Sequence, residues 1–173
     1  MNSAEIDCVL RRLLLGKPVK FLGVFAADKV PKRISQYPFC CVINTDPASK
    51  PGEHWVACYA ESASTLEFFD SFGLPPSTYP HIRGLRNVKF FNNVSLQSMF
   101  SRACGPYCIF YISQRSKGIS SPCIIARISK LNPLQRDSAV VRHLRSIIRK
   151  LIINRPCISD CRGQQCCQPR TRF

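Results

Sequence analysis

The stretch from Ser95 to Phe110 constrains the fold of this 173-residue chain more than any other stretch. It places Cys104 directly before a Gly-Pro pair, and the apolar residues that follow predict a buried helix that runs to about Arg115. A cysteine in the first turn of a helix lies near the positive end of the helix dipole, which favours its thiolate. Gln97, seven residues upstream, carries an amide that can donate a hydrogen bond to a developing oxyanion. The stretch therefore indicates a nucleophilic cysteine.

Two upstream residues supply the remaining chemistry of such a site. His54, which Trp55 follows, lies at the start of a predicted strand, and Asp70 lies at the end of the next one. An imidazole can take the proton of a thiol and return it to a leaving amine, while a carboxylate holds the imidazole in the correct tautomer. Each residue also has a plainer interpretation, as a core cysteine, a structural histidine or an acid that begins a turn. Their occurrence in one ordered set favours catalysis.

The strands that carry His54 and Asp70 are predicted to pair as an antiparallel hairpin. If residues 61–63 form the loop, opposed residue numbers sum to 124, so that Val56 faces Phe68 and His54 faces Asp70. Directly opposed residues have Cβ atoms about 4.5–5.5 Å apart on one face of the sheet. We therefore predict that the imidazole and the carboxylate lie within hydrogen-bonding reach. A longer loop would shift this register.

Together these residues resemble the adenovirus protease (adenain) family of cysteine endopeptidases and, more distantly, the ubiquitin-like-protein proteases. The matching features are the His-Trp pair, the acid in Phe-Phe-Asp-Ser-Phe-Gly, the glutamine six intervening residues before the cysteine, and Ala-Cys-Gly. The resemblance covers about residues 8–115. It implies an α+β, papain-like fold in which helices flank a central mixed β-sheet. It also implies that the catalytic residues are His54, Asp70, Gln97 and Cys104.

The resemblance implies a cysteine endopeptidase that cleaves viral or virus-like precursor proteins after glycine during particle maturation. Capsid or core precursors are the expected substrates, a monomer is the expected state, and the virion and host nucleus are the expected locations. Trp55 is predicted to line the substrate groove, with core packing as the alternative. Two other functions stay open: a ubiquitin-like-protein isopeptidase, and an inactive basic DNA-binding core protein with a protease fold.

Activation by a short peptide is a further implication of the resemblance. In adenovirus proteases that peptide forms a disulfide with a cysteine lying before the oxyanion glutamine. The stretch from His81 to Gln97 contains no cysteine here, so covalent activation in that form is not expected. A peptide that binds without a covalent bond, or no peptide at all, remains the expectation.

The net charge of +15 is concentrated in the C-terminal part of the chain. Residues 1–103 hold 12 basic and 8 acidic residues, whereas residues 104–173 hold 13 basic and 2 acidic ones. A one-sided basic surface is typical of proteins that bind a polyanion. We predict that DNA binds this part and activates the enzyme, as the resemblance also implies. The residues proposed for DNA binding are Arg142, Arg145, Arg149 and Lys150; the alternative is a solvated basic face.

The length and the hydrophobic content of 45% fit one domain, expected over residues 1–154, with a basic, Cys-rich flexible tail at 155–173. Many of the eleven cysteines lie inside apolar runs, which favours a reducing compartment. No metal is expected, because the spacing of the last four cysteines is not a paired zinc framework; these are Cys157, Cys161, Cys166 and Cys167. Neither a membrane span nor a signal peptide is expected.

The hydrophobic pattern also predicts the order of elements. Ser3 is expected to cap the first helix, and Asp137 or Ser138 the last. Helices are expected at 3–15, 104–115, 121–130 and 138–153, and extended segments at 18–27, 39–45, 54–60, 65–69 and 87–92.

Overall fold

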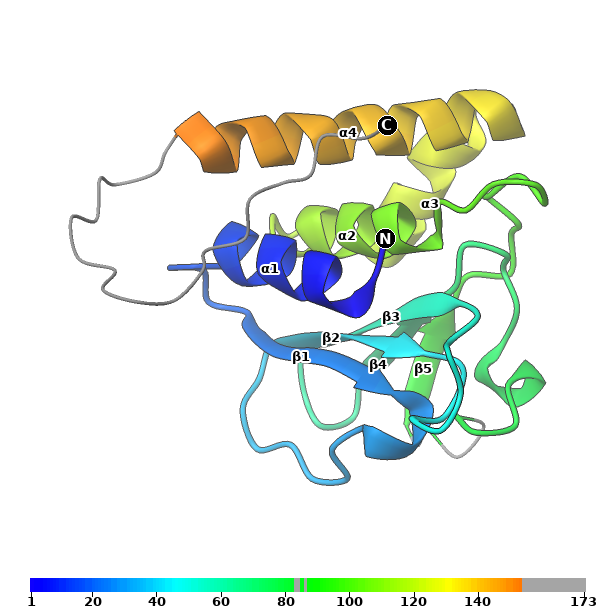
Figure 1. The fold of residues 1–173 in the computed structure, drawn as a ribbon. Coiled ribbons are helices and arrows are strands. Elements are labelled where there is room, and N and C mark those ends of the chain that lie inside the picture. The colour runs from blue at the N-terminus through cyan, green and yellow to red at the C-terminus, as the bar shows by residue number, and fades with distance from the viewer. Residues whose placement is uncertain (83–84, 86, 154–173) are drawn as a thin grey trace.

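A five-stranded mixed β-sheet forms the base of the molecule, and its helices lie on one face of that sheet (Figure 1). The computed structural model describes residues 1–82, 85 and 87–153. The elements are α1 (Ser3–Leu13), β1 (Lys20–Ala26), the 3₁₀ turn η1 (Ala27–Lys29), β2 (Phe39–Asn44), β3 (Trp55–Ala60), β4 (Leu66–Phe69), the 3₁₀ turn η2 (Pro76–Thr78), β5 (Val88–Phe91), α2 (Cys104–Arg115), α3 (Ser121–Ser129) and α4 (Pro133–Ile153). The predicted α+β class with a mixed sheet and flanking helices is confirmed.

The strands follow one another across the sheet in the order in which they occur along the chain. β2, β3 and β4 pair antiparallel, whereas β1 pairs parallel with β2 and β5 parallel with β4. All six residues of β2 are buried, because this strand has neighbours on both sides and apolar groups on both faces. Such a strand has the continuous apolar sequence seen at Phe39–Asn44 rather than a strict alternation.

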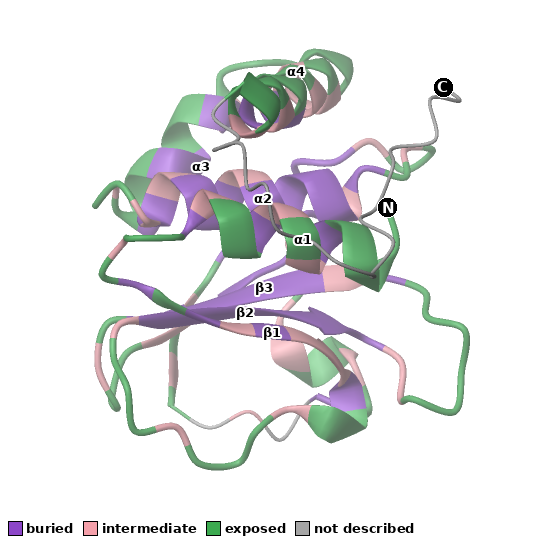
Figure 2. Cartoon of the chain, turned by 60° about the vertical axis from the view of Figure 1, so that its left-hand side comes forward, coloured by how far each residue is buried: buried purple, intermediate pink, exposed green. Residues whose placement is uncertain are grey.

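Successive residues of the central strands contribute to two separate cores. Cys40 and Val42 belong to the core between the sheet and the helices, whereas Cys41 and Ile43 belong to a smaller core on the open face. This division follows from the two-residue period of a strand. Figure 2 shows the buried surface concentrated in the strands and in α2, with exposed residues along the outer helices.

α2 is the most enclosed helix because it contacts β3 on one side and α4 on the other (Figures 1 and 2). Tyr107, Ile109, Tyr111 and Ile112 are all fully buried. A helix that is apolar nearly all round is typically buried between two layers. Cys104 is the first residue of α2, so the packing of this buried helix fixes the position of the cysteine.

The cap of the first helix lies one residue earlier than predicted. Asn2, rather than Ser3, caps α1: its side chain accepts a hydrogen bond from the backbone N–H of Glu5, and the Glu5 carboxylate accepts one from the backbone N–H of Asn2. This reciprocal pair is a capping box, which satisfies two backbone donors that the helix leaves free.

The last helix begins at Pro133, several residues before the predicted cap at Asp137 or Ser138. Asn132 and Gln135 form a second capping box across this start. Asp137 lies inside the helix instead, where its carboxylate accepts a hydrogen bond from the Tyr107 hydroxyl. The prediction failed because an aspartate can serve either a cap or a tertiary contact.

Two predictions fall at or beyond the end of the described residues. The boundary at residue 154 and the Cys-rich segment 155–173, with its four cysteines, lie outside them. Among the described residues, no cluster of three or more His, Cys, Asp or Glu side chains could hold a metal ion. No helix in the described ranges is both long and apolar enough to cross a membrane.

Candidate active site

Cys104 is the first residue of α2, as the sequence predicts. Its side chain is half-buried, and the other described cysteines are free thiols too. Interaction with the backbone N–H groups of Trp55 and Gly105 lowers the pKa of its thiol. A helix start with two amide groups directed at one thiol stabilises negative charge on it.

His54 and Asp70 form a buried pair at the end of the β3–β4 hairpin. His54 Nε2 lies 2.6 Å from Asp70 Oδ1, and the two side chains are 8% and 0% exposed. Because a carboxylate only accepts, His54 donates the proton from Nε2. The other ring nitrogen, Nδ1, is then left for the Cys104 thiol, and the interaction between the two groups raises the pKa of His54 and lowers that of Cys104.

The predicted hydrogen bond exists, but the predicted hairpin register was wrong. Cys58 pairs with Phe68 and Ala57 with Phe69, so opposed numbers sum to 126 rather than 124. The turn is longer than assumed, because Ser62 and Thr65 close it through a backbone hydrogen bond. A two-residue shift keeps every side chain on its original face, so His54 and Asp70 remain on one face as diagonal neighbours.

Asp70 shapes the loop after β4 as well as holding the imidazole. Its carboxylate accepts hydrogen bonds from the backbone N–H groups of Phe72 and Leu74 and from the Tyr79 hydroxyl, at 3.0, 3.1 and 2.7 Å. Gly73 closes the turn with φ of +74°, and a Cβ atom there would lie 2.5 Å from the Val94 carbonyl carbon. Glycine is therefore required at this position.

Asn92 is a site residue that the sequence analysis did not identify. It is buried directly after β5, and its side-chain oxygen accepts a hydrogen bond from the backbone N–H of Asp70 at 2.9 Å. Its side-chain nitrogen donates to the Asp70 carbonyl. Asn92 thus fixes the backbone that carries the carboxylate. An asparagine at a strand end has no distinctive sequence signal, because such residues are common in turns.

The electrostatics of the three residues favour a thiolate–imidazolium pair. Burial lowers the pKa of His54, but its contacts with Asp70 and Cys104 outweigh burial and raise that pKa to about 9. Burial raises the pKa of Cys104, but His54 and the two backbone N–H groups outweigh it and lower the pKa below its usual value. Burial raises the pKa of Asp70, but its hydrogen bond with His54 outweighs burial, and the pKa of this carboxyl is lowered.

Gln97 is buried at the base of the loop that precedes α2. Its Oε1 accepts a hydrogen bond from the Ser71 hydroxyl at 2.7 Å, and its Nε2 donates to the Ser101 carbonyl at 2.6 Å. Because a backbone carbonyl cannot donate, these partners fix the orientation of the amide. One of the two hydrogens on Nε2 is used by Ser101. The other makes no hydrogen bond to the described residues.

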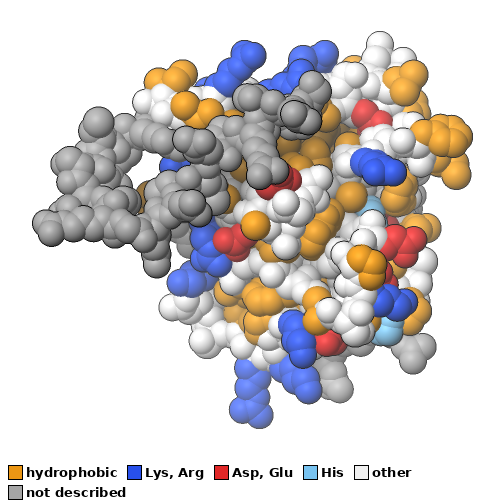
Figure 3. Space-filling model, in the orientation of Figure 1, with side chains coloured by type: hydrophobic (Ala, Val, Ile, Leu, Met, Phe, Trp, Pro, Cys, Tyr) orange, Lys and Arg blue, Asp and Glu red, His pale blue; other side chains and the backbone are white. Residues whose placement is uncertain are grey.

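The remaining predicted residues are placed as follows. Trp55 is partly buried against the main core, and its indole N–H donates to the Met1 carbonyl at 3.3 Å. The four basic residues proposed for DNA binding are exposed on α4. Figure 3 shows Lys and Arg side chains over that helix at the top of the view.

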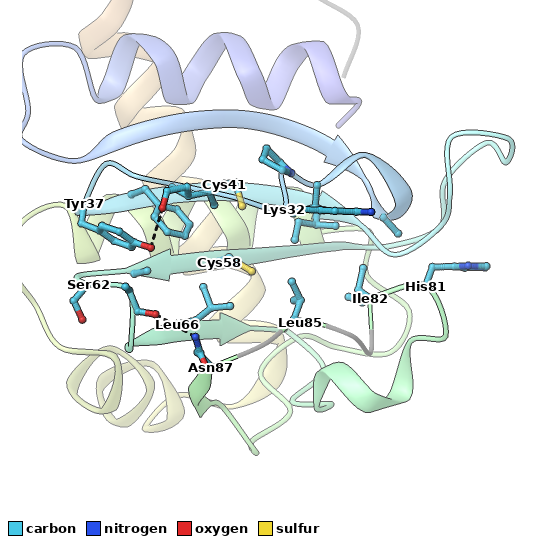
Figure 4. A pocket seen from close by; sticks show the side chains of 18 residues that line it. Lys32, Tyr37, Cys41, Cys58, Ser62, Leu66, His81, Ile82, Leu85 and Asn87 are labelled. Carbon is cyan, nitrogen blue, oxygen red and sulfur yellow. Dashed lines mark hydrogen bonds between the residues drawn. The ribbon is translucent and has the colours of Figure 1, made fainter.

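A cavity of about 550 Å³ lies on the open face of the sheet, away from the four predicted catalytic residues (Figure 4). Cys41, Cys58, Leu66, Ile82 and Leu85 are among its lining residues. None of His54, Asp70, Gln97 and Cys104 lines it. This cavity is therefore separate from the four candidate catalytic side chains.

A helix-start thiol beside an imidazole that a buried carboxylate holds is an arrangement that can activate a cysteine as a nucleophile. Comparisons with known proteins place the chain more closely. The cysteine protease S273R of African swine fever virus, described in its Pretoriuskop isolate as a SUMO-1 cysteine protease, is 33% identical over 122 residues, which are 61% of this chain. The protease of porcine adenovirus A serotype 3 is 27% identical over 138 residues, which are 68% of this chain and 65% of the relative.

The similarity to adenovirus-type viral cysteine proteases that the motifs indicate is thereby confirmed. The matches span only 35–44% of the length of the African swine fever virus relatives. No family model matches the chain. Among solved structures, the central domain of the Lpg1148 protein of Legionella pneumophila shares the fold alone, with a TM-score of 0.50 and 13% identity over 86% of this chain and 97% of that one.

Proposed function

We propose that this protein is a cysteine endopeptidase that cleaves viral or virus-like precursor proteins by way of an acyl-enzyme. The observation that carries the proposal is the contact of His54 with both Asp70 and Cys104, which favours a charged pair before any substrate binds. Both named relatives are proteases, and that of African swine fever virus is a cysteine protease, which supports the same reaction type.

The reaction begins when the Cys104 thiolate attacks the carbonyl carbon of the scissile peptide bond. The resulting oxyanion accepts hydrogen bonds from the free Nε2 hydrogen of Gln97 and from the backbone N–H of Cys104. His54 then gives its proton to the leaving amine as the C–N bond breaks, which produces a thioester and a neutral imidazole. Water, deprotonated by that imidazole, attacks the thioester and releases the thiolate.

Asp70 remains ionised throughout this cycle. It holds Nε2–H of His54, so that Nδ1 faces the sulfur, and it stabilises the imidazolium. Trp55 contributes its backbone N–H to the thiolate, and its partly buried indole is the proposed wall of the substrate groove.

The test is Cys104→Ala, assayed by mass spectrometry of a protein library after incubation with the enzyme. We expect the variant to lose cleavage completely and to keep its circular dichroism spectrum, because the side chain is small and half-buried. Cys123→Ala is the matched control, since that thiol is exposed on α3. Undiminished cleavage by Cys104→Ala would overturn the proposal.

An isopeptidase that acts on ubiquitin-like proteins is the second candidate function. One relative is described as a SUMO-1 cysteine protease, which favours testing it. The same catalytic residues could hydrolyse an isopeptide bond, so the chemistry does not separate the two functions. A panel of tagged ubiquitin-like proteins, incubated beside viral core precursors, separates them by which substrate is cut.

We further propose DNA as an activator that binds α4. Arg142, Arg145 and Arg149 recur at helical spacing on one side of α4, while Val140, Leu144 and Ile147 are buried on the other. A non-covalent peptide activator is the alternative regulator, and action within the virion or host nucleus is the proposed setting.

A further inference from the structure

Two large apolar side chains stand almost completely in solvent in the loop that leads to the candidate nucleophile. Met99 is 85% exposed and Phe100 is 98% exposed. Both lie in the loop from β5 to α2, at the right-hand edge of Figure 1, and Figure 3 shows exposed hydrophobic side chains at that edge. Single exposed apolar residues are ordinary, but an adjacent pair near a reactive group is a feature of recognition surfaces.

These two residues occupy the corners of a closed β-turn. The backbone N–H of Ser101 donates to the Ser98 carbonyl at 3.0 Å, which places Met99 and Phe100 at the two central positions. Turn corners usually carry Gly, Pro, Asn, Asp or Ser, because those residues suit the required backbone angles or bond to it. Met and Phe bring no such advantage here, so the turn itself does not explain them.

The base of the turn is tied to the rest of the site. Ser101 accepts a hydrogen bond from Gln97 Nε2 at 2.6 Å through its carbonyl, and its hydroxyl accepts one from the backbone N–H of Ala103 at 3.2 Å. The backbone N–H of Ser98 lies 3.4 Å from the carboxylate of Asp137, on α4. The turn therefore holds its apolar pair outward at a fixed place between Gln97 and Cys104.

We infer that Met99 and Phe100 bind an apolar side chain of the polypeptide substrate, close to the scissile bond. This inference rests on the proposed function. A peptide bond that reaches Cys104 must lie between the nucleophile and Gln97, and the turn connects these two residues in the chain. An apolar substrate side chain that covers the pair removes exposed hydrophobic surface on both partners, which favours binding. The turn would then determine which sequences are cut.

The experiment uses peptide vinyl sulfones that end in glycine and carry either Leu or Ser at each of the next three positions upstream. Second-order rates of reaction at Cys104 are measured by mass spectrometry with the wild type and with Met99→Ser/Phe100→Ser. At one position or more, we expect the Leu probe to react with the wild type at least tenfold faster than its Ser counterpart. In the double variant this advantage should fall to less than twofold.

Two controls separate the inference from its premise. Leu15→Ser/Ile153→Ser removes two apolar side chains of similar exposure, 85% and 79%, at the other end of the helices, and it should keep the full Leu advantage. Iodoacetamide, which has no peptide, should label Cys104 at the same rate in all three proteins. An equal Leu advantage with and without the turn residues, or none in the wild type, would overturn the inference. A wild-type Cys104 that reacts with no reagent would instead overturn the proposed function.

Discussion

At the residue scale, the charge state of two side chains determines when this site can act. His54 has a pKa raised to about 9, and the pKa of Cys104 is lowered from its usual value. Between those two values the thiolate and the imidazolium coexist. Below that window the sulfur is protonated, and above it the imidazole has no proton for the leaving amine.

We therefore expect kcat/KM to rise with pH as Cys104 ionises and to fall again near pH 9 as His54 loses its proton. Asp70→Asn removes the carboxylate that raises the pKa of His54, so the alkaline limb should move to lower pH. The same change should lower turnover by roughly 100- to 10,000-fold, since the correct tautomer is lost as well. The measurement is a pH–rate profile with a cleaved peptide.

Asp7→Asn is the control for this prediction, because Asp7 lies on α1 and pairs there with exposed Arg11. Its profile should match that of the wild type. If Asp70→Asn kept the wild-type alkaline limb, Asp70 would serve only the loop that it folds through Phe72 and Leu74.

At the element scale, a buried ionic cluster joins β4 to α2 and α3. Arg115 has a side chain only 3% exposed, and Glu67 accepts from its Nε at 2.7 Å. The same carboxylate accepts hydrogen bonds from the hydroxyls of Tyr111 and Ser121, each at 2.7 Å. Glu61 also reaches the guanidinium at 2.6 Å, but its side chain is 63% exposed. The Arg115 guanidinium thus has one carboxylate partner that is largely buried, with 17% of its side chain exposed, and one that is largely in solvent.

Replacing Glu67 should lower the free energy of unfolding more than replacing Glu61. Glu67→Ala leaves a buried guanidinium without its main partner, and we expect the free energy of unfolding to fall by about 3–5 kcal/mol. Glu61→Ala removes an exposed partner of the same cation, and the loss should stay below about 1 kcal/mol. Urea denaturation of the two variants measures both values. Equal losses would show that burial does not separate the two contacts.

The elements also show which features a single sequence determines. The helix over Cys104–Arg115 and the strand over Phe39–Asn44 were predicted almost to the residue, because continuous apolar runs identify buried segments. The hairpin register was wrong by two, since turn length depends on hydrogen bonds such as Ser62–Thr65 that the apolar pattern does not encode. The predicted contact of His54 with Asp70 is nevertheless present, because a register shift of two residues leaves both side chains on the same face of the sheet.

The candidate site was less predictable than the fold. The ordered set of His54, Asp70, Gln97 and Cys104 was recognisable from residue types and spacing. Asn92 and Tyr79 were not, because they act by bonding to Asp70 across the fold. Contacts between segments far apart in the chain leave no periodic signal in the sequence.

At the scale of the whole molecule, the basic residues of α4 and the candidate catalytic residues lie in different layers. The His54–Asp70 pair lies at the sheet, whereas the exposed arginines lie on α4, beyond α2. Binding of a polyanion to α4 therefore need not block the site.

We expect duplex DNA to bind with an affinity that falls steeply with salt, with a log–log slope of roughly −0.9 for each phosphate neutralised. Arg145→Glu/Arg149→Glu should weaken binding at least tenfold and leave cleavage of a short peptide without DNA unchanged. Lys32→Glu/Arg33→Glu makes the same charge change in the loop before β2, and it should weaken binding less. Fluorescence anisotropy over a salt series measures each affinity. A flat salt response would show that α4 carries only a solvated basic face.

The position of the nucleophile at the start of α2 has a consequence for the growing polypeptide. His54, Asp70 and Gln97 all leave the ribosome before Cys104, and the five strands are complete by Phe91. Each strand pairs with its neighbour in the chain, so the sheet can assemble in order of synthesis. The thiol meets its imidazole only when α2 docks on that sheet. A nascent chain shorter than this therefore has no assembled site.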